Sequence, residues 1–199
     1  ALVILRDNTE DLSAGVAFNP VPANVAAVLA QESKSFAPFK DLPGDQYAIS
    51  VKVNTRKGCE RILRAAFDFS RKFGRKKVTV VHKANVVRAT DGLFLDIAKD
   101  IAREYPEIQM DEANVDAICM WLLKNPYNYD VLVAPNLYGD IISDLCAQMV
   151  GGLGFGCSGN IGDNLAVFEP SHGSAPKYAG LYKVNPIASI LAAKMMLDW

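Results

Sequence analysis

The stretch Asp130-Val-Leu-Val-Ala-Pro-Asn-Leu-Tyr-Gly-Asp-Ile-Ile-Ser-Asp144 joins a short apolar run to a helical pattern. The run of aliphatic residues predicts a buried strand over 130–134. The apolar spacing beyond it predicts a helix over 139–150. A strand that leads directly into a helix is the unit from which layered α/β folds are built.

The same order recurs along the rest of the chain. Further strands are predicted over 1–6, 47–53, 78–81 and 164–168. Further helices are predicted over 56–73, 90–104, 112–124 and 185–198. Residues 14–46 differ, because four prolines and an Ala-rich helical stretch at 22–33 indicate an excursion rather than a separate domain. The sequence therefore predicts an α/β layered architecture with one inserted excursion.

The amino-acid composition limits the classes of protein to which this chain can belong. The chain has 199 residues, of which 50% are hydrophobic and 22% charged, so it can bury a core and is not disordered. Because 21 basic residues face 22 acidic ones, we expect no nucleic-acid or membrane partner. No apolar run reaches the roughly 18–20 residues that span a bilayer. The chain begins without Met in an apolar run, which predicts a portion of a longer protein that starts inside a strand.

Four cysteines, at 59, 119, 146 and 157, form no C-x-x-C pair and have no histidine at metal-ligand spacing. We therefore expect free thiols in a reducing compartment, with neither a zinc site nor a Cys–His nucleophile.

The segment Gly154-Phe-Gly-Cys-Ser-Gly159 matches the G-x-G-x-x-G pattern of dinucleotide-binding loops. That motif requires a strand before it and a helix N-terminus after it, to hold a pyrophosphate. Here a predicted helix precedes it and no helix follows. We interpret it as a glycine-rich loop, not as a Rossmann signature.

Asp140 and Asp144 lie one turn apart on the helix predicted over 139–150. Two like charges in this arrangement repel unless a cation offsets them, and a hard ion such as Mg²⁺ or Mn²⁺ suits carboxylate oxygens. From spacing alone, a metal site and a solvated acidic face are equally good explanations.

Three other segments carry groups suited to ligand binding. Lys83 directly follows the strand at 78–81, where a lysine can serve as an acid or base. Lys177 lies in a loop of small residues after the strand at 164–168 and can face a phosphate. Arg6, at the end of the first strand, suits a bidentate carboxylate or one of its own acidic neighbours. From the residues alone, a surface charge is the better explanation for Lys83, and a structured loop is the better explanation for the segment of Lys177.

Five segments together resemble the family of decarboxylating dehydrogenases that act on isocitrate, isopropylmalate, homoisocitrate and tartrate. The segments are Arg6–Gly15, His82–Asn85, Asn136–Asp140, Ser143–Asp144 and His172–Gly180. The resemblance covers essentially the whole chain in the same order. It is strongest to bacterial-type NADP-dependent isocitrate dehydrogenases, and it implies that family's layered α/β fold, which is not a Rossmann fold.

The resemblance implies substrate-binding and catalytic roles. Arg6 matches the arginine that binds a substrate carboxylate, and Asn85 is assigned to substrate binding. Lys83 matches a lysine, lent across the dimer, that acts as acid or base at the substrate hydroxyl. Ser13 stands where family members usually have a tyrosine that protonates the enolate after decarboxylation. A serine hydroxyl is a weaker acid with a shorter reach, so this step is impaired or falls to another group.

The resemblance also implies a metal and a second subunit. Asp140 and Asp144 match the metal-binding aspartates, and Asp116 matches the aspartate given to the neighbouring subunit's metal site. The implied cofactor is Mg²⁺ or Mn²⁺, acting as a Lewis acid. The implied assembly is a homodimer with shared active sites. The implied reaction is the oxidative decarboxylation of isocitrate to 2-oxoglutarate.

A nicotinamide cofactor is implied by the loop that matches the family's adenosine-binding segment. Its implied contacts are His172, Gly173, Ser174, Ala175, Lys177, Tyr178 and Asn185. NAD-preferring members typically carry an aspartate at the position of Lys177, which would repel a 2′-phosphate. Lys177 and Tyr178 instead fit a 2′-phosphate, so the resemblance implies NADP.

The family's chains are longer, with an N-terminal region that supplies further substrate-binding residues. We therefore expect residues 1–135 to form a small dimerisation and substrate domain, with the excursion near 14–46. Residues 136–199 would form part of a large cofactor-binding domain. The implied location is the cytoplasm, or the mitochondrial matrix in a eukaryote. Two alternatives stay open: a homoisocitrate-like or other β-decarboxylating dehydrogenase, and a catalytically weak regulatory subunit, which Ser13 motivates.

Overall fold

The computed structural model describes residues 2–199, and its central feature is a four-stranded parallel sheet of order β1-β6-β4-β5. The strands are β1 (Val3–Arg6), β6 (Val131–Ala134), β4 (Lys77–His82) and β5 (Gln109–Asn114). Every residue of β6 is buried, and so is all of β4 after Lys77. Parallel strands covered on both faces carry continuous apolar runs rather than alternating ones, which the sequence of β6 shows.

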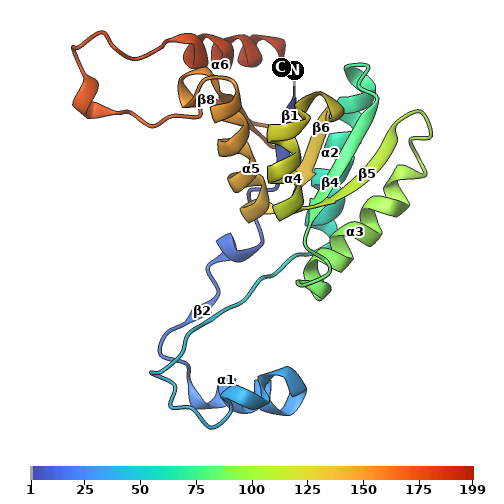
Figure 1. Ribbon diagram of the computed structural model, residues 1–199, viewed down its shortest axis with the longest axis vertical. Helices are drawn as coiled ribbons and strands as arrows, with labels where there is room; N and C mark the ends of the chain where they lie inside the picture. Colours follow the sequence, from blue (N-terminus) through green and yellow to red (C-terminus); the bar gives the residue numbers. More distant parts are fainter. Residues whose placement is uncertain (1) are drawn as a thin grey trace. The chain divides into compact units, whose positions relative to one another are not determined.

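Two helices, α2 (Arg56–Lys72) and α3 (Arg88–Ala102), pack beside the sheet and share one core with it (Figure 1). The side chain of Thr55 accepts a hydrogen bond from Gly58 N at 3.0 Å and so caps the start of α2. The shared core consists of large apolar side chains from both helices and the two central strands. Its fully or almost fully buried members include Leu63, Phe67, Phe94, Val80 and Val133.

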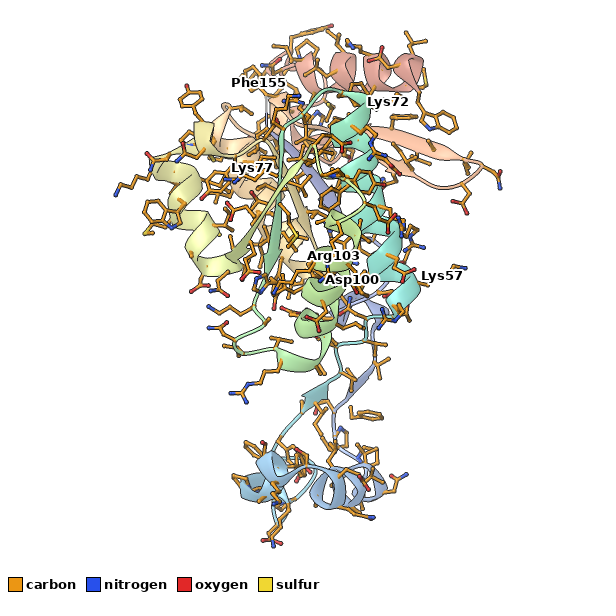
Figure 2. All side chains as sticks on the ribbon, turned by 90° about the vertical axis from the view of Figure 1, so that its right-hand side faces the viewer. Lys57, Lys72, Lys77, Asp100, Arg103 and Phe155 are labelled. Atoms are coloured by element: carbon orange, nitrogen blue, oxygen red, sulfur yellow. The ribbon has the colours of Figure 1, made fainter. Side chains whose placement is uncertain are left out.

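The direction of α2 fixes which edge of the sheet carries the strand ends. Lys57 and Lys72 lie at opposite ends of this helix (Figure 2). Lys77 begins β4 five residues after Lys72, so the carboxyl ends of the strands lie toward the end of α2 that Lys57 marks. Ligand sites in open parallel sheets gather at this carboxyl edge.

Between β1 and α2 runs the excursion predicted near 14–46. It consists of β2 (Ala17–Phe18), α1 (Ala23–Glu32), a 3₁₀ segment (Lys34–Phe39) and β3 (Ile49–Ser50). The strand predicted over 47–53 is mostly absent, since only Ile49–Ser50 pairs with β2 and Val53 forms a single bridge to Asp11. The paired part is short because β2, the strand it pairs with, has only two residues.

The contacts divide the chain into two units, residues up to Val115 with Tyr129–Gly139, and Asp116–Asn128 with Asp140–Trp199. Each is described by itself. The second contains most of α4 and α5, a β7–β8 hairpin and α6. The bounds are α4 (Val115–Lys124), α5 (Asn136–Met149), β7 (Cys157–Ile161), β8 (Ala166–Pro170) and α6 (Ile187–Asp198). The domain boundary at 135 that the resemblance implies stays a prediction.

The glycine-rich segment 154–159 serves the packing of this hairpin. The strand β7 begins at Cys157, so the predicted loop is partly strand, and no helix follows it. A Cβ on Gly159 would lie 3.0 Å from Met195 Sδ on α6 and 3.0 Å from the Phe168 ring on β8. Glycine is favoured there by close packing, which is a different use from binding a pyrophosphate.

Four predicted helix starts are displaced by two or three residues. Residues 109–114 form the edge strand β5, paired in register with all six residues of β4, and the helix begins only at Val115. β5 contains no β-branched residue, so its pairing with β4 overrides its weak local preference for a strand. The helices predicted from 90, 139 and 185 begin at Arg88, Asn136 and Ile187. None of the helices in residues 2–199 has the length and apolar character needed to span a bilayer.

Candidate functional site

Arg6 ends β1 at the carboxyl edge and is held there by Asn136, the residue that begins α5 just beyond β6. Arg6 Nε and Nη2 donate to Asn136 Oδ1 at 3.1 and 2.8 Å. Asn136 is almost fully buried and donates from Nδ2 to the Glu10 carbonyl oxygen at 3.2 Å. These bonds fix the plane of a guanidinium that is itself only half-buried.

Gly139 allows the first turn of α5 to approach this arginine closely. A Cβ at position 139 would lie 2.6 Å from Arg6 Cγ and 2.7 Å from Arg6 Cβ. Both are distances that real Cβ atoms do not reach, so any larger residue would displace the arginine or the helix.

The acidic residues that follow Arg6 have partners on α2. Asp7 is buried and accepts from Arg61 Nη2 at 3.1 Å. Glu10 accepts from Thr55 N at 2.7 Å and also from the Thr55 hydroxyl. The loop after β1 is therefore tied to the start of α2 by charge-assisted hydrogen bonds.

Lys83 follows the last residue of β4 and is partly exposed. Its backbone N–H donates to Asp91 Oδ2 at 2.7 Å. The neighbouring His82 is buried, and its Nδ1 accepts from Ala84 N at 3.0 Å. Burial lowers the pKa of His82, so near neutral pH its ring is uncharged and carries its proton on Nε2.

A group of buried charged side chains, which the sequence analysis did not predict, lies next to the backbone of Lys83. Asp11 and Asp91 are fully buried, and Lys52 forms an ion pair with Asp91 while its Nζ lies 3.8 Å from Asp11 Oδ1. Lys52 Nζ also lies 4.6 Å from the centre of the Tyr138 ring. Burial and the charge of Asp91 raise the pKa of Tyr138, whose hydroxyl hydrogen-bonds to that carboxylate. The phenol therefore stays protonated.

Ser13 and Asn85 complete the predicted residues of the first unit, and both are exposed. Ser13 lies in a single 3₁₀ turn, Leu12–Ala14, capped by the Asp11 side chain. Asn85 is two residues beyond Lys83, in the turn that precedes α3. The first unit thus holds Arg6, Ser13, Lys83 and Asn85 in the segments that follow β1 and β4.

The three predicted metal ligands belong to the second unit. Asp140 and Asp144 are exposed and lie one turn apart on α5, as the spacing predicted. Asp116 is exposed in the first turn of α4. Within residues 2–199 no three His, Cys, Asp or Glu side chains converge tightly enough to hold a metal ion. Two exposed carboxylates on one helix face nevertheless provide the hard oxygen atoms that Mg²⁺ or Mn²⁺ prefers.

The predicted cofactor loop borders an open hollow of about 230 Å³. Its lining residues are Gly154, His172, Ala175, Tyr178, Lys183 and Val184. His172 Nδ1 donates to the Gly173 carbonyl oxygen at 2.8 Å, which leaves Nε2 as an acceptor. That Nε2 atom is buried and has no hydrogen-bond partner among the described residues. A ligand that fills the hollow with a hydrogen-bond donor would satisfy it.

Lys177 and Asn185 stand near this hollow. Lys177 is exposed, with its Nζ 4.9 Å from the centre of the Tyr178 ring. Asn185 Oδ1 accepts from Ile187 N at 3.0 Å, and its Cβ lies 3.2 Å from the position of a Cβ on Gly154. The cofactor-binding residues that the resemblance implies in this loop all lie within the single segment from His172 to Tyr178. Gly173 and Ser174 are exposed within it.

All four cysteines are free thiols. Burial raises the pKa of Cys59 to about 11, with Glu10 and Asp7 adding to the effect, and burial raises the pKa of Cys146 to about 11. Such thiols are protonated near neutral pH and are poor nucleophiles.

A parallel sheet with an arginine, a lysine and buried carboxylates at its carboxyl edge places this chain in the class of α/β folds that bind ligands at that edge. The match to the isocitrate/isopropylmalate dehydrogenase family extends over residues 1–199, and the chain belongs to that family.

Relatives span several branches of the family. The chain is 52% identical over 148 residues to the alpha subunit of the probable mitochondrial isocitrate dehydrogenase (NAD) of Drosophila melanogaster, covering 74% of this chain and 39% of that one. It is 43% identical over 196 residues to the 3-isopropylmalate dehydrogenase of Archaeoglobus fulgidus, covering 98% and 53%. It is 43% identical over 198 residues to the homoisocitrate dehydrogenase of Methanocaldococcus jannaschii, covering 100% and 50%.

The structure agrees with these relatives. The crystal structure of isocitrate dehydrogenase from Methylococcus capsulatus superposes with a TM-score of 0.83 at 46% identity, covering 99% of this chain and 52% of that one. The α/β fold is therefore that of the family and not a Rossmann fold. The chain spans about half the length of the curated relatives it matches over its full extent.

Proposed function

We propose that the protein catalyses the metal-dependent oxidative decarboxylation of isocitrate to 2-oxoglutarate, with reduction of NADP. Membership of the family supports the reaction class. The observation that carries the proposal is the Arg6–Asn136 arrangement, in which a half-buried guanidinium is oriented at the carboxyl edge of the sheet. A fixed guanidinium is the group best suited to orient a carboxylate of a tricarboxylic acid.

In this proposal residues of the first unit bind the substrate and move its protons, with Lys83 lent to each site by a second copy of the chain. Arg6 binds a substrate carboxylate, and Asn85 hydrogen-bonds to the substrate. Lys83 takes the proton from the substrate hydroxyl oxygen as the C2–H bond breaks. The nicotinamide and the divalent cation, when bound, supply a hydride acceptor and a Lewis acid.

Asp140 and Asp144 would hold the cation, with Asp116 contributed by a second copy of the chain. The donor chemistry fits, because carboxylate oxygens are hard ligands and the charge of a cation offsets their repulsion. Two ligands from one helix leave room for substrate oxygen atoms, which suits Mg²⁺ or Mn²⁺. The proposed assembly is accordingly a homodimer with shared sites.

The choice of NADP over NAD follows from charge. Lys177 presents an ammonium group beside the Tyr178 ring, and a cation is suited to a 2′-phosphate. The relatives include proteins named for NAD, so this preference belongs to the proposal and not to the family. The proposed location is the cytoplasm, or the mitochondrial matrix in a eukaryote, and some relatives are named as mitochondrial.

Ser13 favours a second candidate, a catalytically weak or regulatory subunit. The chain is 45% identical over 177 residues to a mitochondrial regulatory subunit of the isocitrate dehydrogenase (NAD) of Dictyostelium discoideum. The exposed serine offers no phenol to return a proton to the substrate carbon. The identities to isopropylmalate and homoisocitrate dehydrogenases keep a different hydroxy acid as a third candidate.

The test compares full-length wild type with the Ser13→Tyr variant, each supplied with Mg²⁺, NADP and isocitrate. The proposal expects wild type to form NADPH, and Ser13→Tyr to form it faster if the serine limits the final protonation. Absence of turnover in wild type with recovery in Ser13→Tyr would favour the regulatory candidate. Turnover of homoisocitrate or isopropylmalate but not of isocitrate would favour the third.

A further inference from the structure

Lys52 lies between the two fully buried carboxylates of the first unit. Its side chain is only 12% exposed, whereas Asp11 and Asp91 expose nothing. It forms an ion pair with Asp91 Oδ1, and its Nζ lies 3.8 Å from Asp11 Oδ1. One largely buried ammonium group therefore faces two fully buried carboxylates.

The same two carboxylates hold backbone N–H groups of three separate segments. Asp91 uses its second oxygen, Oδ2, to accept from Lys83 N at 2.7 Å. Asp11 accepts from Leu12 N at 2.7 Å, and its Oδ2 accepts from Leu137 N at 3.2 Å. The three segments are the end of β4, the turn that carries Ser13, and the start of α5.

This arrangement depends on the charge of Lys52. Two buried carboxylates repel each other, and the nearby N–H dipoles offset only part of that cost. If Lys52 lost its charge, Asp11 and Asp91 would move apart, take up protons or admit water. Any of these changes would release the Lys83 N–H or shift the turn at Leu12.

We infer that Lys52 is a positioning residue, which holds Lys83 and the turn of Ser13 in place through Asp91 and Asp11. This inference rests on the proposed function of Lys83. A positioning role is distinct from the surface ion pairs elsewhere in the unit, of which Lys77–Asp111 is an example at 2.8 Å with both side chains partly exposed. Lys77 begins β4, at the end away from Lys83.

The test uses full-length protein with the Lys52→Met variant, which keeps the length of the side chain and removes its charge. The matched control is Lys77→Met (Lys77 is labelled in Figure 2), which breaks an ion pair at the other end of β4. For Lys52→Met we expect kcat for NADP reduction to fall at least tenfold, while KM for isocitrate changes less than threefold. For Lys77→Met both should stay within twofold of wild type.

A second readout does not depend on activity. Amide hydrogen exchange in peptides that contain Leu12 and Lys83 should become at least tenfold faster in Lys52→Met and stay unchanged in Lys77→Met. If the wild type turns over none of the hydroxy acids but exchange at Lys83 rises in Lys52→Met, the proposed function fails and the positioning role stands. Unchanged kcat and unchanged exchange in Lys52→Met overturn the inference.

The double variant Lys52→Met/Asp91→Asn separates positioning from simple stability. It removes one buried carboxylate together with the lysine, so we expect its Tm to recover toward wild type even if Lys52→Met folds poorly. With both Lys52 and the Asp91 carboxylate removed, no ion pair fixes the side chain at position 91, so kcat should stay low. Full recovery of both Tm and kcat would contradict a positioning role.

Discussion

Lys177 is the residue on which the proposed cofactor preference depends. Its ammonium group is exposed and beside the Tyr178 ring, so it can meet a phosphate on the adenosine ribose. In Lys177→Asp we expect the ratio of kcat/KM for NADP to that for NAD to fall at least tenfold, which is about 1.4 kcal/mol of discrimination. Steady-state assays of full-length protein with both cofactors measure it.

The control for this substitution is Lys194→Asp, an equal change of charge on the exposed face of α6. It should leave the ratio unchanged. If Lys177→Asp also leaves the ratio unchanged, the loop does not distinguish the two cofactors.

His82 makes stability depend on pH in a direction fixed by its burial. Burial lowers the pKa of His82 below the ordinary 6.5, so the folded protein disfavours the charged ring that the unfolded chain readily forms. The contribution of neutral His82 is therefore fully present above about pH 6.5 and is lost as pH falls from there toward the folded-state pKa.

The variant His82→Asn keeps an acceptor for Ala84 N and removes the titration. Between about pH 7.5 and 5.5 we expect wild type to lose about 1 kcal/mol more free energy of unfolding than His82→Asn. Urea titrations of both proteins at the two pH values measure the difference. Equal losses of free energy of unfolding in the two proteins would mean that folding does not lower the pKa of His82.

At the scale of elements, the sequence predicts those strands and helices whose local pattern and tertiary role agree. The helix at 56–73 is predicted almost to the residue, because its apolar stripe faces the core and Thr55 caps it. The strand β5 is not predicted from the sequence, because Gln109–Asn114 is mostly polar and becomes a strand only by pairing with β4. The strand β7 is not predicted for a related reason, since it forms by pairing with β8 and its Gly159 packs closely against α6 and β8.

The approach of α5 to β1 gives a prediction about two glycines in helices. Gly139→Ala places a methyl group against Arg6, and overpacking of this kind costs about 1–3 kcal/mol. We also expect KM for the hydroxy acid to rise, because the guanidinium that Asn136 holds must move. Gly92→Ala is the control, since a Cβ there meets nothing within 4 Å.

In that control, removing a glycine from the interior of α3 should stabilise the protein by about 0.5–1 kcal/mol. Chemical denaturation and substrate titration of both variants test the pair. Equal effects of the two substitutions on stability would show that contact with Arg6 is not what requires glycine at position 139.

At the scale of the whole molecule, the candidate residues of the site can be predicted from the sequence, whereas the residues that support them come from the structure. Arg6 stands out because it ends a strand, Lys83 because it follows one, and Asp140 and Asp144 because they share a helix face. Asn136 had a usable signal, since it is a polar residue in the short connection between the predicted strand at 130–134 and the predicted helix at 139–150. Lys52 and Asp91 had none, because they are 39 residues apart and meet only through the fold.

The central claim is that the complete protein couples oxidation of a hydroxy acid to loss of its β-carboxylate. The most direct measurement follows NADPH and CO₂ together, using full-length wild type with Mg²⁺ and isocitrate. The account predicts one CO₂ for each NADPH, with both abolished by a chelator and in Asp140→Asn. A folded protein that reduces neither NADP nor NAD with isocitrate, homoisocitrate or isopropylmalate, or that reduces them without releasing CO₂, would contradict it.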